Sequence, residues 1–224
     1  MKIRLTEGDI SYMVMEALSQ ILNETIMDEG ILRELEISEP SEGAEPVNIM
    51  VGRFQPFTIG HLECLYQAKQ KTGCKTIVFA SKGDPNPKKD KPIYGELQDE
   101  MLDRIKANHS DVIADIVYGN GAAIDKNVAI ARSKGYEPIS WVTGQDHEAA
   151  YWNMVVRYGK ELKLNPDFKM TILDRDPDAD DVTGVSASKV REAIVAGDKK
   201  EFSRMMPKEL YDLYDGFRNM LVGQ

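Results

Sequence analysis

From residue 47 onward, short apolar segments alternate with longer segments of helical periodicity, and this alternation constrains the fold more than any other feature. The predicted strands cover residues 47–51, 76–80, 115–118, 139–142 and 170–173. The predicted helices cover residues 60–71, 95–108, 125–134, 147–158 and 186–196, with two short helices across residues 199–221. Repeated strand–helix–strand units form a parallel sheet that helices cover on both faces. The sequence therefore predicts a three-layer, Rossmann-like α/β domain over residues 47–224.

The first 46 residues differ from this domain in pattern and in charge. Residues 1–37 have helical periodicity, with an apolar stripe that includes Ile10, Val14 and Leu18. Residues 38–46 have the Ser, Glu, Gly and Pro content of a linker. Residues 1–46 hold 11 acidic and 3 basic residues and so carry most of the net charge of −9. We expect a helical N-terminal extension whose apolar stripe contacts another protein or a second copy of the chain.

Composition excludes several functional classes. The chain has no run of 18 or more apolar residues, and Glu7 and Asp9 interrupt the part of a secretory signal that would be apolar. We therefore expect neither a membrane partner nor secretion. Residues 47–224 are nearly neutral and lack the basic face of a nucleic-acid-binding protein. Cys64 and Cys74 do not have a metal-binding spacing and are expected to be the reduced thiols of a cytoplasmic protein.

The segment from Gly52 to His61 reads Gly-Arg-Phe-Gln-Pro-Phe-Thr-Ile-Gly-His and joins a predicted strand to a predicted helix. The N-terminus of a helix exposes unpaired N–H groups and a partial positive charge, which together favour a bound phosphate. Arg53, Thr58 and His61 would add polar side chains that can interact with the negative charge of a phosphate as that charge shifts during a reaction. Taken singly, a Gly-Arg turn or one histidine is more often structural, so the interpretation as a phosphate site depends on the combination.

A second helix start of this kind reads Val-Ser-Ala-Ser-Lys-Val-Arg from Val185 to Arg191. Ser186 is the predicted N-cap, and Val185 and Val190 then occupy the positions of a hydrophobic staple. Lys189 and Arg191 are unfavourable beside the positive end of the helix dipole unless an anion is present. The segment therefore indicates a second phosphate site, and the alternative is that both basic side chains are only solvated.

Together the two segments resemble the signatures of the nucleotidyltransferase superfamily, His-x-Gly-His and Ile-Ser-x-Thr/Ser-x-x-Arg. The Gly-Arg-Phe-Gln-Pro form is most similar to archaeal-type and bacteriophage-encoded nicotinamide mononucleotide (NMN) adenylyltransferases. Thr58 stands at the first histidine of the family pattern, as a threonine does in phosphopantetheine adenylyltransferases, and Val185 replaces isoleucine. The resemblance covers residues 47–210.

The resemblance implies an enzyme that transfers a nucleotidyl group directly to a phosphomonoester and releases pyrophosphate. His61 and Thr58 would contact the transferring phosphate, and Arg53 would orient substrate phosphates. Mg²⁺ is the expected cofactor, held mainly by the substrate phosphates rather than by protein ligands. The β- and γ-phosphates would be held by Ser186, Ser188 and Arg191, and the other predicted nucleotide- or phosphate-binding residues are Gly52, Phe54, Gly60, Lys189, Gly144 and Asp146.

Three further positions have two interpretations each. Asp146 follows the end of a predicted strand and could contact ribose hydroxyls or a metal ion, or it could cap the next helix. Trp152 could stack on a nicotinamide ring or pack in the core. Lys82 begins a lysine-rich segment, residues 81–92, which could cover a triphosphate as a lid or form a solvated loop.

The preferred reaction is ATP plus NMN giving NAD and pyrophosphate. One alternative is a cytidylyl- or adenylyltransferase for another phosphomonoester, such as phosphopantetheine or a glycerol or sugar phosphate. Another is a non-catalytic nucleotide-binding protein tethered to an assembly by residues 1–37. The expected partners are a nucleoside triphosphate and a small phosphomonoester in the cytoplasm, which is the host cytoplasm if a phage encodes the chain.

Overall fold

The computed structural model describes residues 42–86, 91–119, 121, 123–144, 148–160, 162–173 and 184–223. The predicted N-terminal helix lies outside the described residues, as do Asp146 and residues 87–90 of the lysine-rich segment. The division of the chain into an extension, a linker and a domain therefore stays a prediction.

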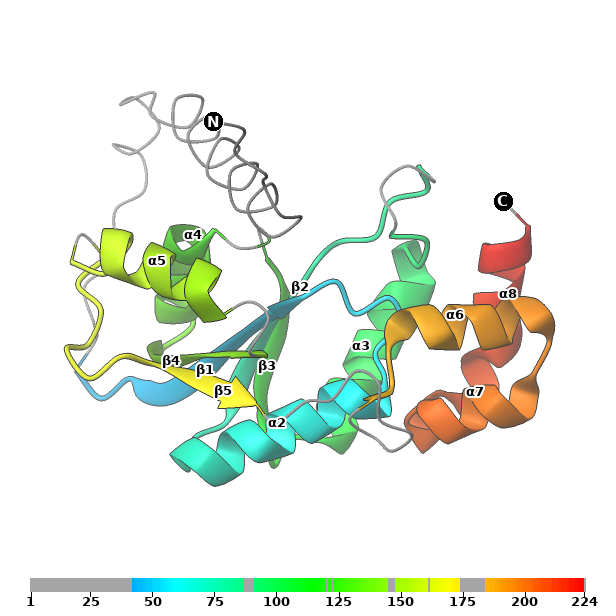
Figure 1. Ribbon diagram of the computed structural model, residues 1–224, viewed down its shortest axis with the longest axis horizontal. Coiled ribbons are helices and arrows are strands. Elements are labelled where there is room, and N and C mark those ends of the chain that lie inside the picture. Colours follow the sequence, from blue (N-terminus) through cyan, green and yellow to red (C-terminus); the bar gives the residue numbers. More distant parts are fainter. Residues whose placement is uncertain are drawn as a thin grey trace, which may run out of the picture. The chain divides into compact units, whose positions relative to one another are not determined.

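Five parallel strands form one sheet in the order β3-β2-β1-β4-β5 (Figure 1). The chain runs outward from β1 to β3 and then returns to the other side of β1 with β4. The direction therefore switches between β1 and β4, and ligands of open parallel sheets bind beyond the carboxyl ends of the strands at such a point. The strands are β1 (Glu45–Gly52), β2 (Thr76–Ala80), β3 (Ile113–Tyr118), β4 (Tyr136–Gly144) and β5 (Lys169–Leu173).

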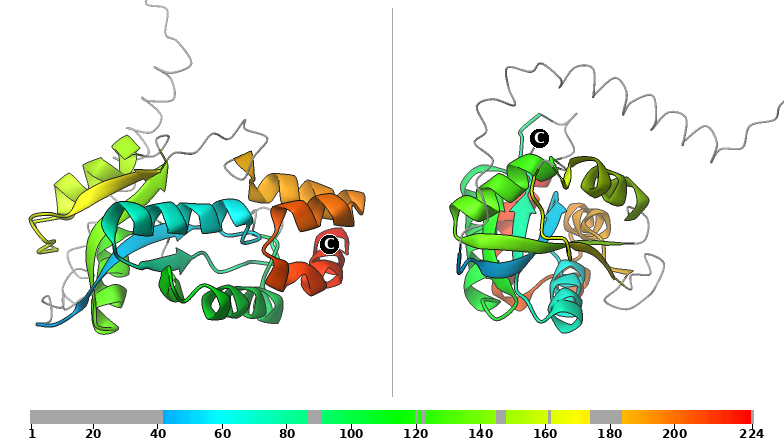
Figure 2. Two further views of the ribbon diagram at one scale, coloured as in Figure 1. Left: turned by 90° about the horizontal axis from the view of Figure 1, so that it is seen from below. Right: turned by 90° about the vertical axis from the view of Figure 1, so that its left-hand side faces the viewer.

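Helices cover both faces of the sheet (Figures 1 and 2). Val78 of β2 belongs to the apolar cluster that contains α2 and α3, whereas its neighbour Ile77 belongs to the cluster that contains α4 and α5. Because successive side chains of a strand point to opposite faces, an apolar run such as β2 can serve both layers. The covering helices are α2 (Ile59–Thr72), α3 (Gly95–Asn108), α4 (Ile124–Ser133) and α5 (Glu148–Tyr158).

Four short helical segments follow β5 and pack against the α2 and α3 layer. Phe202, Leu210 and Phe217 place them in the same apolar cluster as α2 and α3. His109, at the end of α3, pairs with Glu209 at 2.6 Å between Nε2 and Oε1. Among the described helices, none is long and apolar enough to cross a membrane. The four segments are α6 (Ala187–Ala196), α7 (Lys199–Met205), the 3₁₀ helix η4 (Lys208–Leu213) and α8 (Tyr214–Val222).

The predicted fold class and element order are confirmed, and the differences lie at element ends. β2 and α3 have the predicted bounds, whereas β1 and β3 each begin two residues earlier and β4 is longer at both ends. The two predicted C-terminal helices are in fact three, because Pro207 ends α7 and a 3₁₀ turn intervenes before α8. Helical periodicity alone does not separate a 3₁₀ turn from the α-helix that follows it.

A row of buried polar side chains crosses the sheet from β1 to β5. Asn48 donates to Thr72 Oγ1 and to the Cys74 carbonyl, both at 2.9 Å, and accepts from Ser140 Oγ at 2.7 Å. Thr171 Oγ1 continues the row by donating to Ser140 Oγ at 3.0 Å. These bonds fix the end of α2 and the registers of β4 and β5 relative to β1.

Asn48→Ala is expected to lower the free energy of unfolding by about 2–3 kcal/mol, because the buried Ser140 and the half-buried Thr72 and Cys74 lose their hydrogen bonds together. Denaturant unfolding measures the loss. The control is Asn108→Ala at the exposed end of α3, where the amide donates to the Arg104 carbonyl at 2.8 Å. The control should change by less than about 0.5 kcal/mol, and equal losses in the two variants would contradict this role of Asn48.

Candidate active site

The turn after β1 is built around the close approach of Gly52 and Phe54. Phe54 has a φ of 50°, in the left-handed region that residues other than glycine rarely adopt. Its ring folds back over Gly52, where an added Cβ would lie 2.8 Å from the tip of the ring. A residue larger than glycine at position 52 would therefore displace the ring, which is 2 % exposed.

His61 closes the N-terminus of α2. Thr58 is the N-cap and its Oγ1 accepts from the His61 N–H at 3.4 Å, while His61 Nδ1 accepts from the Thr58 N–H at 2.9 Å. A backbone N–H can only donate, so Nδ1 must be an unprotonated nitrogen. A neutral His61 ring in this position carries its proton on Nε2, which makes Nε2 a hydrogen-bond donor.

Two phenylalanine rings hold the His61 imidazole in place. The ring centroids of Phe54 and Phe57 lie 4.9 and 5.3 Å from that of His61, and the two phenylalanines stack on each other at 5.1 Å. Thr58 is fully buried with its Oγ1 3.0 Å from His61 Nδ1, whereas His61 is partly exposed. Of the two residues expected at the transferring phosphate, His61 is the accessible one. Thr58 is buried behind it and contacts its Nδ1.

The second predicted phosphate segment begins α6. Ser186 is the N-cap, and its Oγ accepts from the Lys189 N–H at 3.3 Å. Val185 and Val190 are both buried in one apolar cluster. The predicted cap and the burial of the predicted staple are therefore confirmed. Lys189 Nζ donates to the Gly184 carbonyl at 3.1 Å, so this lysine lies across the start of the helix.

Arg191 joins the two predicted phosphate segments. Its Nη1 donates to the main-chain carbonyl of Gln55 at 2.7 Å, and its Nη2 donates to Ser188 Oγ at 3.3 Å. Gln55 lies in the turn between β1 and α2, 136 positions from Arg191 in sequence. The N-terminal half of α6 is thus bonded directly to the turn that leads into α2, the helix whose third residue is His61.

Helices α2 and α6 differ from the other described helices in the charge of their first turn. Neither has an acidic residue there. An acidic side chain in the first turn would compete with a phosphate for the free N–H groups and the helix dipole. Among the described helices, the N-termini of α2 and α6 are therefore the ones suited to an anion. The other described helices each have an acidic residue in the first turn: Glu96, Asp125, Glu148, Glu201, Glu209 and Asp215.

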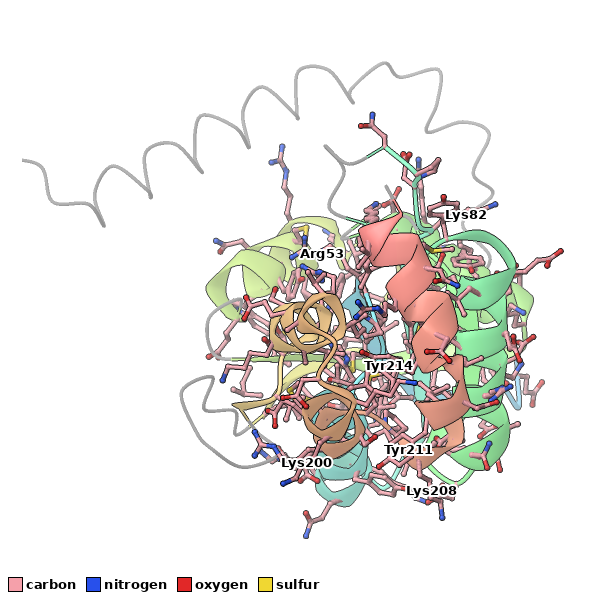
Figure 3. The ribbon with its side chains drawn as sticks, turned by 90° about the vertical axis from the view of Figure 1, so that its right-hand side faces the viewer. Arg53, Lys82, Lys200, Lys208, Tyr211 and Tyr214 are labelled. Carbon is pink, nitrogen blue, oxygen red and sulfur yellow. The ribbon has the colours of Figure 1, made fainter. Side chains whose placement is uncertain are left out.

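Arg53 and Lys82 are exposed just beyond the carboxyl ends of β1 and β2 (Figure 3). Lys82 Nζ lies 5.9 Å from the ring centroid of Tyr118, at the end of β3. Burial, together with the hydrogen bond from its hydroxyl to Asp99, raises the pKa of Tyr118, so this hydroxyl stays protonated. Figure 3 shows Lys208 on the opposite side of the view, away from the predicted site.

Two buried glutamines anchor the segment after β2. Gln98 Nε2 donates to the Ser81 carbonyl at 2.9 Å, and its Oε1 accepts from the Gly83 N–H at 2.8 Å. Gln55 binds the carbonyl and the N–H of Ile93 in the same way, at 2.9 and 2.7 Å. The sequence pattern assigned neither glutamine a role, because glutamine is mostly an exposed residue. The one available signal was the position of Gln55 inside the first motif.

The remaining predicted residues lie on β4, α2 and α5. Gly144 ends β4, the strand beside β1 at the switch point, and Gly60 is buried in the first turn of α2. Trp152 is 45 % exposed, so the interpretation of Trp152 as a core residue is wrong. The core tryptophan is Trp141, which stacks on Tyr151 with 4.7 Å between ring centroids.

The class of protein follows from the fold together with a family comparison. A family model described as cytidylyltransferase-like matches residues 49–193, which is more than half of the chain and includes both motifs. The chain belongs to this cytidylyltransferase-like family and is a nucleotidyltransferase. A comparison with curated protein sequences gave no match.

Two solved structures are similar in fold. Plasmodium falciparum nicotinic acid mononucleotide adenylyltransferase, complexed with NaAD, has a TM-score of 0.56 and 15 % identity, over 80 % of this chain and 98 % of that one. A bifunctional NMN adenylyltransferase/ADP ribose pyrophosphatase from Francisella tularensis, complexed with AMP and a manganese ion, has a TM-score of 0.51 and 17 % identity. That match covers 80 % of this chain and 51 % of the bifunctional protein. At these identities the likeness shows the fold alone.

Gly52→Ala is expected to push the Phe54 ring aside and to move His61 with it. Overpacking of this kind costs about 1–3 kcal/mol of unfolding free energy, and turnover should fall further than stability alone explains. Denaturant unfolding and pyrophosphate release measure the two effects. The control is Gly216→Ala, within α8. There the added Cβ meets only the flexible end of the Leu97 side chain, at 3.2 Å. The same loss of turnover in the control would contradict the account of the turn.

Proposed function

We propose that the protein is an adenylyltransferase that condenses ATP with NMN to give NAD and pyrophosphate. The bond from Arg191 to the Gln55 carbonyl carries this proposal, because it links α6 to the turn that leads into α2, and the N-termini of both helices lack a carboxylate. Two anion-binding ends at one turn suit a triphosphate whose α-phosphate reacts while its β- and γ-phosphates leave. The choice of NMN is supported by the resemblance of the first motif and by the name of the Francisella tularensis protein, an NMN adenylyltransferase. The Plasmodium falciparum protein is named for the related nicotinic acid mononucleotide.

In the proposed reaction, an oxygen of the NMN phosphate attacks the α-phosphorus of ATP in line with the departing oxygen. One P–O bond forms, the bond from the α-phosphorus to the bridging oxygen breaks, and pyrophosphate leaves with that electron pair. The acceptor phosphate is already ionised at neutral pH, so no base has to remove a proton. Such a reaction depends on positioning and on stabilisation of negative charge.

His61 stabilises the charge that develops on the α-phosphate. Its Nε2–H donates to a non-bridging oxygen, and the bond from the Thr58 N–H to Nδ1 fixes the ring before the substrate binds. Thr58 therefore acts by positioning His61, and Arg53 orients the acceptor phosphate. The β- and γ-phosphates are held by Ser186, Ser188, Lys189 and Arg191.

The other predicted residues shape the site around these phosphates. Gly52 and Gly60 let the turn and the first helical turn approach the ligand, with Phe54 packed behind His61. Gly144, with Asp146 beyond it, would contact the ribose of the nucleotide at the end of β4. The residues proposed to contact the rest of the substrates are Lys82, over the triphosphate, and Trp152, on the nicotinamide ring.

Mg²⁺ is the proposed metal ion, entering with the triphosphate. It would neutralise charge on the phosphates, as hard cations do in nucleotide sites. Among the described residues, no group of three His, Cys, Asp or Glu side chains could hold a metal ion. In this proposal, phosphate oxygens and water supply most of the Mg²⁺ ligands, and chelation of divalent ions should abolish turnover.

The alternative acceptors within the class are phosphopantetheine and glycerol or sugar phosphates. They remain alternatives because Thr58 stands where phosphopantetheine adenylyltransferases also have a threonine. We propose a cytoplasmic location because ATP and NMN are available there, and residues 1–37 are proposed to contact another protein or a second copy of the chain. The decisive test pairs each of the four nucleoside triphosphates with NMN, phosphopantetheine and glycerol phosphate, scored by pyrophosphate release. ATP with NMN should give the highest rate. A higher rate with another pair would replace the substrates, and no release from any pair would overturn catalysis.

His61→Ala is expected to lower turnover by about 10²- to 10³-fold, the usual loss for one donor to a transition state. His61→Asn separates catalysis from capping, because its side-chain oxygen can still accept from the Thr58 N–H but offers no donor at the position of Nε2. Both variants should therefore lose turnover. The melting temperature of His61→Asn should be closer to that of wild type than the melting temperature of His61→Ala is. His109→Ala is the histidine control, and it should lose stability but not turnover. Near-wild-type turnover in folded His61→Asn would overturn the assigned role.

Arg191→Ala is expected to weaken binding of a non-hydrolysable ATP analogue by about tenfold or more, since a charge-assisted donor to phosphate is lost. Arg218→Ala is the matched control, because Arg218 also donates to a main-chain carbonyl, that of Ile194 within α6, at 3.2 Å. Calorimetric titration should give the control the wild-type affinity. Equal affinities for all three proteins would place Arg191 outside the site.

A further inference from the structure

Gln55 bonds one residue with its side chain and another with its main chain. The side-chain amide is 1 % exposed and satisfies both main-chain groups of Ile93, donating from Nε2 at 2.9 Å and accepting at Oε1 at 2.7 Å. Ile93 is itself fully buried and follows the lysine-rich segment. The main-chain carbonyl of Gln55 accepts from Arg191 Nη1 at 2.7 Å.

These two attachments constrain each other because they belong to one residue. The direction of the Gln55 carbonyl depends on the backbone angles of the turn, and the amide clamp on Ile93 resists any rotation that would move its own side chain. Releasing the clamp would leave the buried N–H and carbonyl of Ile93 without their partner, which is strongly unfavourable. The carbonyl that receives Arg191 is therefore held in direction before any ligand binds.

We infer that Gln55 is a positioning residue that fixes Arg191 for binding the departing phosphates, through the carbonyl that its buried amide clamp holds in place. This inference rests on the proposed function, in which Arg191 binds the β- and γ-phosphates. Gln55 does not touch the substrate in this account. It acts on triphosphate affinity only through Arg191.

The chain contains a matched comparison for this role. Gln98 is also fully buried and clamps the other end of the same segment, at Ser81 and Gly83, with nearly the same distances. Its main-chain carbonyl, however, lies inside α3, where it accepts a hydrogen bond from a main-chain N–H of the next helical turn. A substitution at Gln98 perturbs an equivalent buried clamp without altering the carbonyl that receives Arg191.

Gln55→Glu turns the clamp into a pH-sensitive one. A protonated carboxyl can still donate to the Ile93 carbonyl and accept from the Ile93 N–H, whereas an ionised carboxylate can only accept and would face that carbonyl oxygen. Full burial can raise the pKa of such a carboxyl by about 3 units from its ordinary value of about 4.3, which places it between pH 6.0 and pH 8.5. The clamp should therefore be intact at pH 6.0 and broken at pH 8.5.

The test is a double-mutant cycle with a non-hydrolysable ATP analogue, titrated calorimetrically at both pH values into wild type, Gln55→Glu, Arg191→Ala and the double variant. Relative to wild type at the same pH, Gln55→Glu should bind within about twofold at pH 6.0 and about tenfold more weakly at pH 8.5. In the Arg191→Ala background the same change should add less than about twofold at either pH. Gln98→Glu should change the dissociation constant by the same factor in the wild-type background and in the Arg191→Ala background.

The inference is overturned if the Gln55→Glu penalty at pH 8.5 persists undiminished in the Arg191→Ala background, or if Gln98→Glu shows the same coupling to Arg191. Circular dichroism checks folding at each pH. If Gln55→Glu unfolds at pH 8.5, Gln55→Met takes its place, and it should show a pH-independent penalty that Arg191→Ala removes. Wild type that binds no triphosphate would overturn the proposed function itself, whereas binding without coupling overturns only the role of Gln55.

Discussion

The hydrogen bond from Arg191 to the main-chain carbonyl of Gln55 is the contact on which the rest of the site depends. It joins the start of α6 to the turn after β1, and in the proposed function the two motifs together bind the three phosphates of the nucleotide. The helices around this bond share one apolar cluster with α2 and α3, so core packing sets its geometry. Core packing is close to rigid, and a site assembled in this way needs little reorganisation when charge develops.

In the proposed function, the imidazole of His61 serves both the fold and the chemistry. His61 Nδ1 takes the place that a glutamate usually has in a capping box, so the helix end is closed without a negative charge. That choice leaves the positive end of α2 available to a phosphate and directs the remaining ring proton to Nε2. The phenylalanines at positions 54 and 57 then restrict the ring, which explains why an unusual backbone conformation at Phe54 is retained.

Sequence reasoning predicted the sheet, the helix order and the two phosphate motifs, because apolar periodicity and helix capping are local signals. It missed the first residues of β4, where Glu137 and Pro138 resemble a loop. Glu137 instead pairs with the buried Arg132, with 2.8 Å between Nη2 and Oε1, and lies in β4. The roles of Gln55 and His109 depend on partners 38 and 100 positions away, which no local pattern contains. The exposure of Trp152 likewise depends on which face of α5 meets the sheet.

The most direct test of the central claim is a crystal structure of the protein with a non-hydrolysable ATP analogue and NMN. The account predicts a triphosphate between the N-termini of α2 and α6, with His61 Nε2 within hydrogen-bonding distance of an α-phosphate oxygen. It also predicts Arg191 in contact with the β- or γ-phosphate while its bond to the Gln55 carbonyl persists. A triphosphate bound elsewhere, or one that touches the first turn of α2 without Arg191, would contradict the claim that these two motifs form one site.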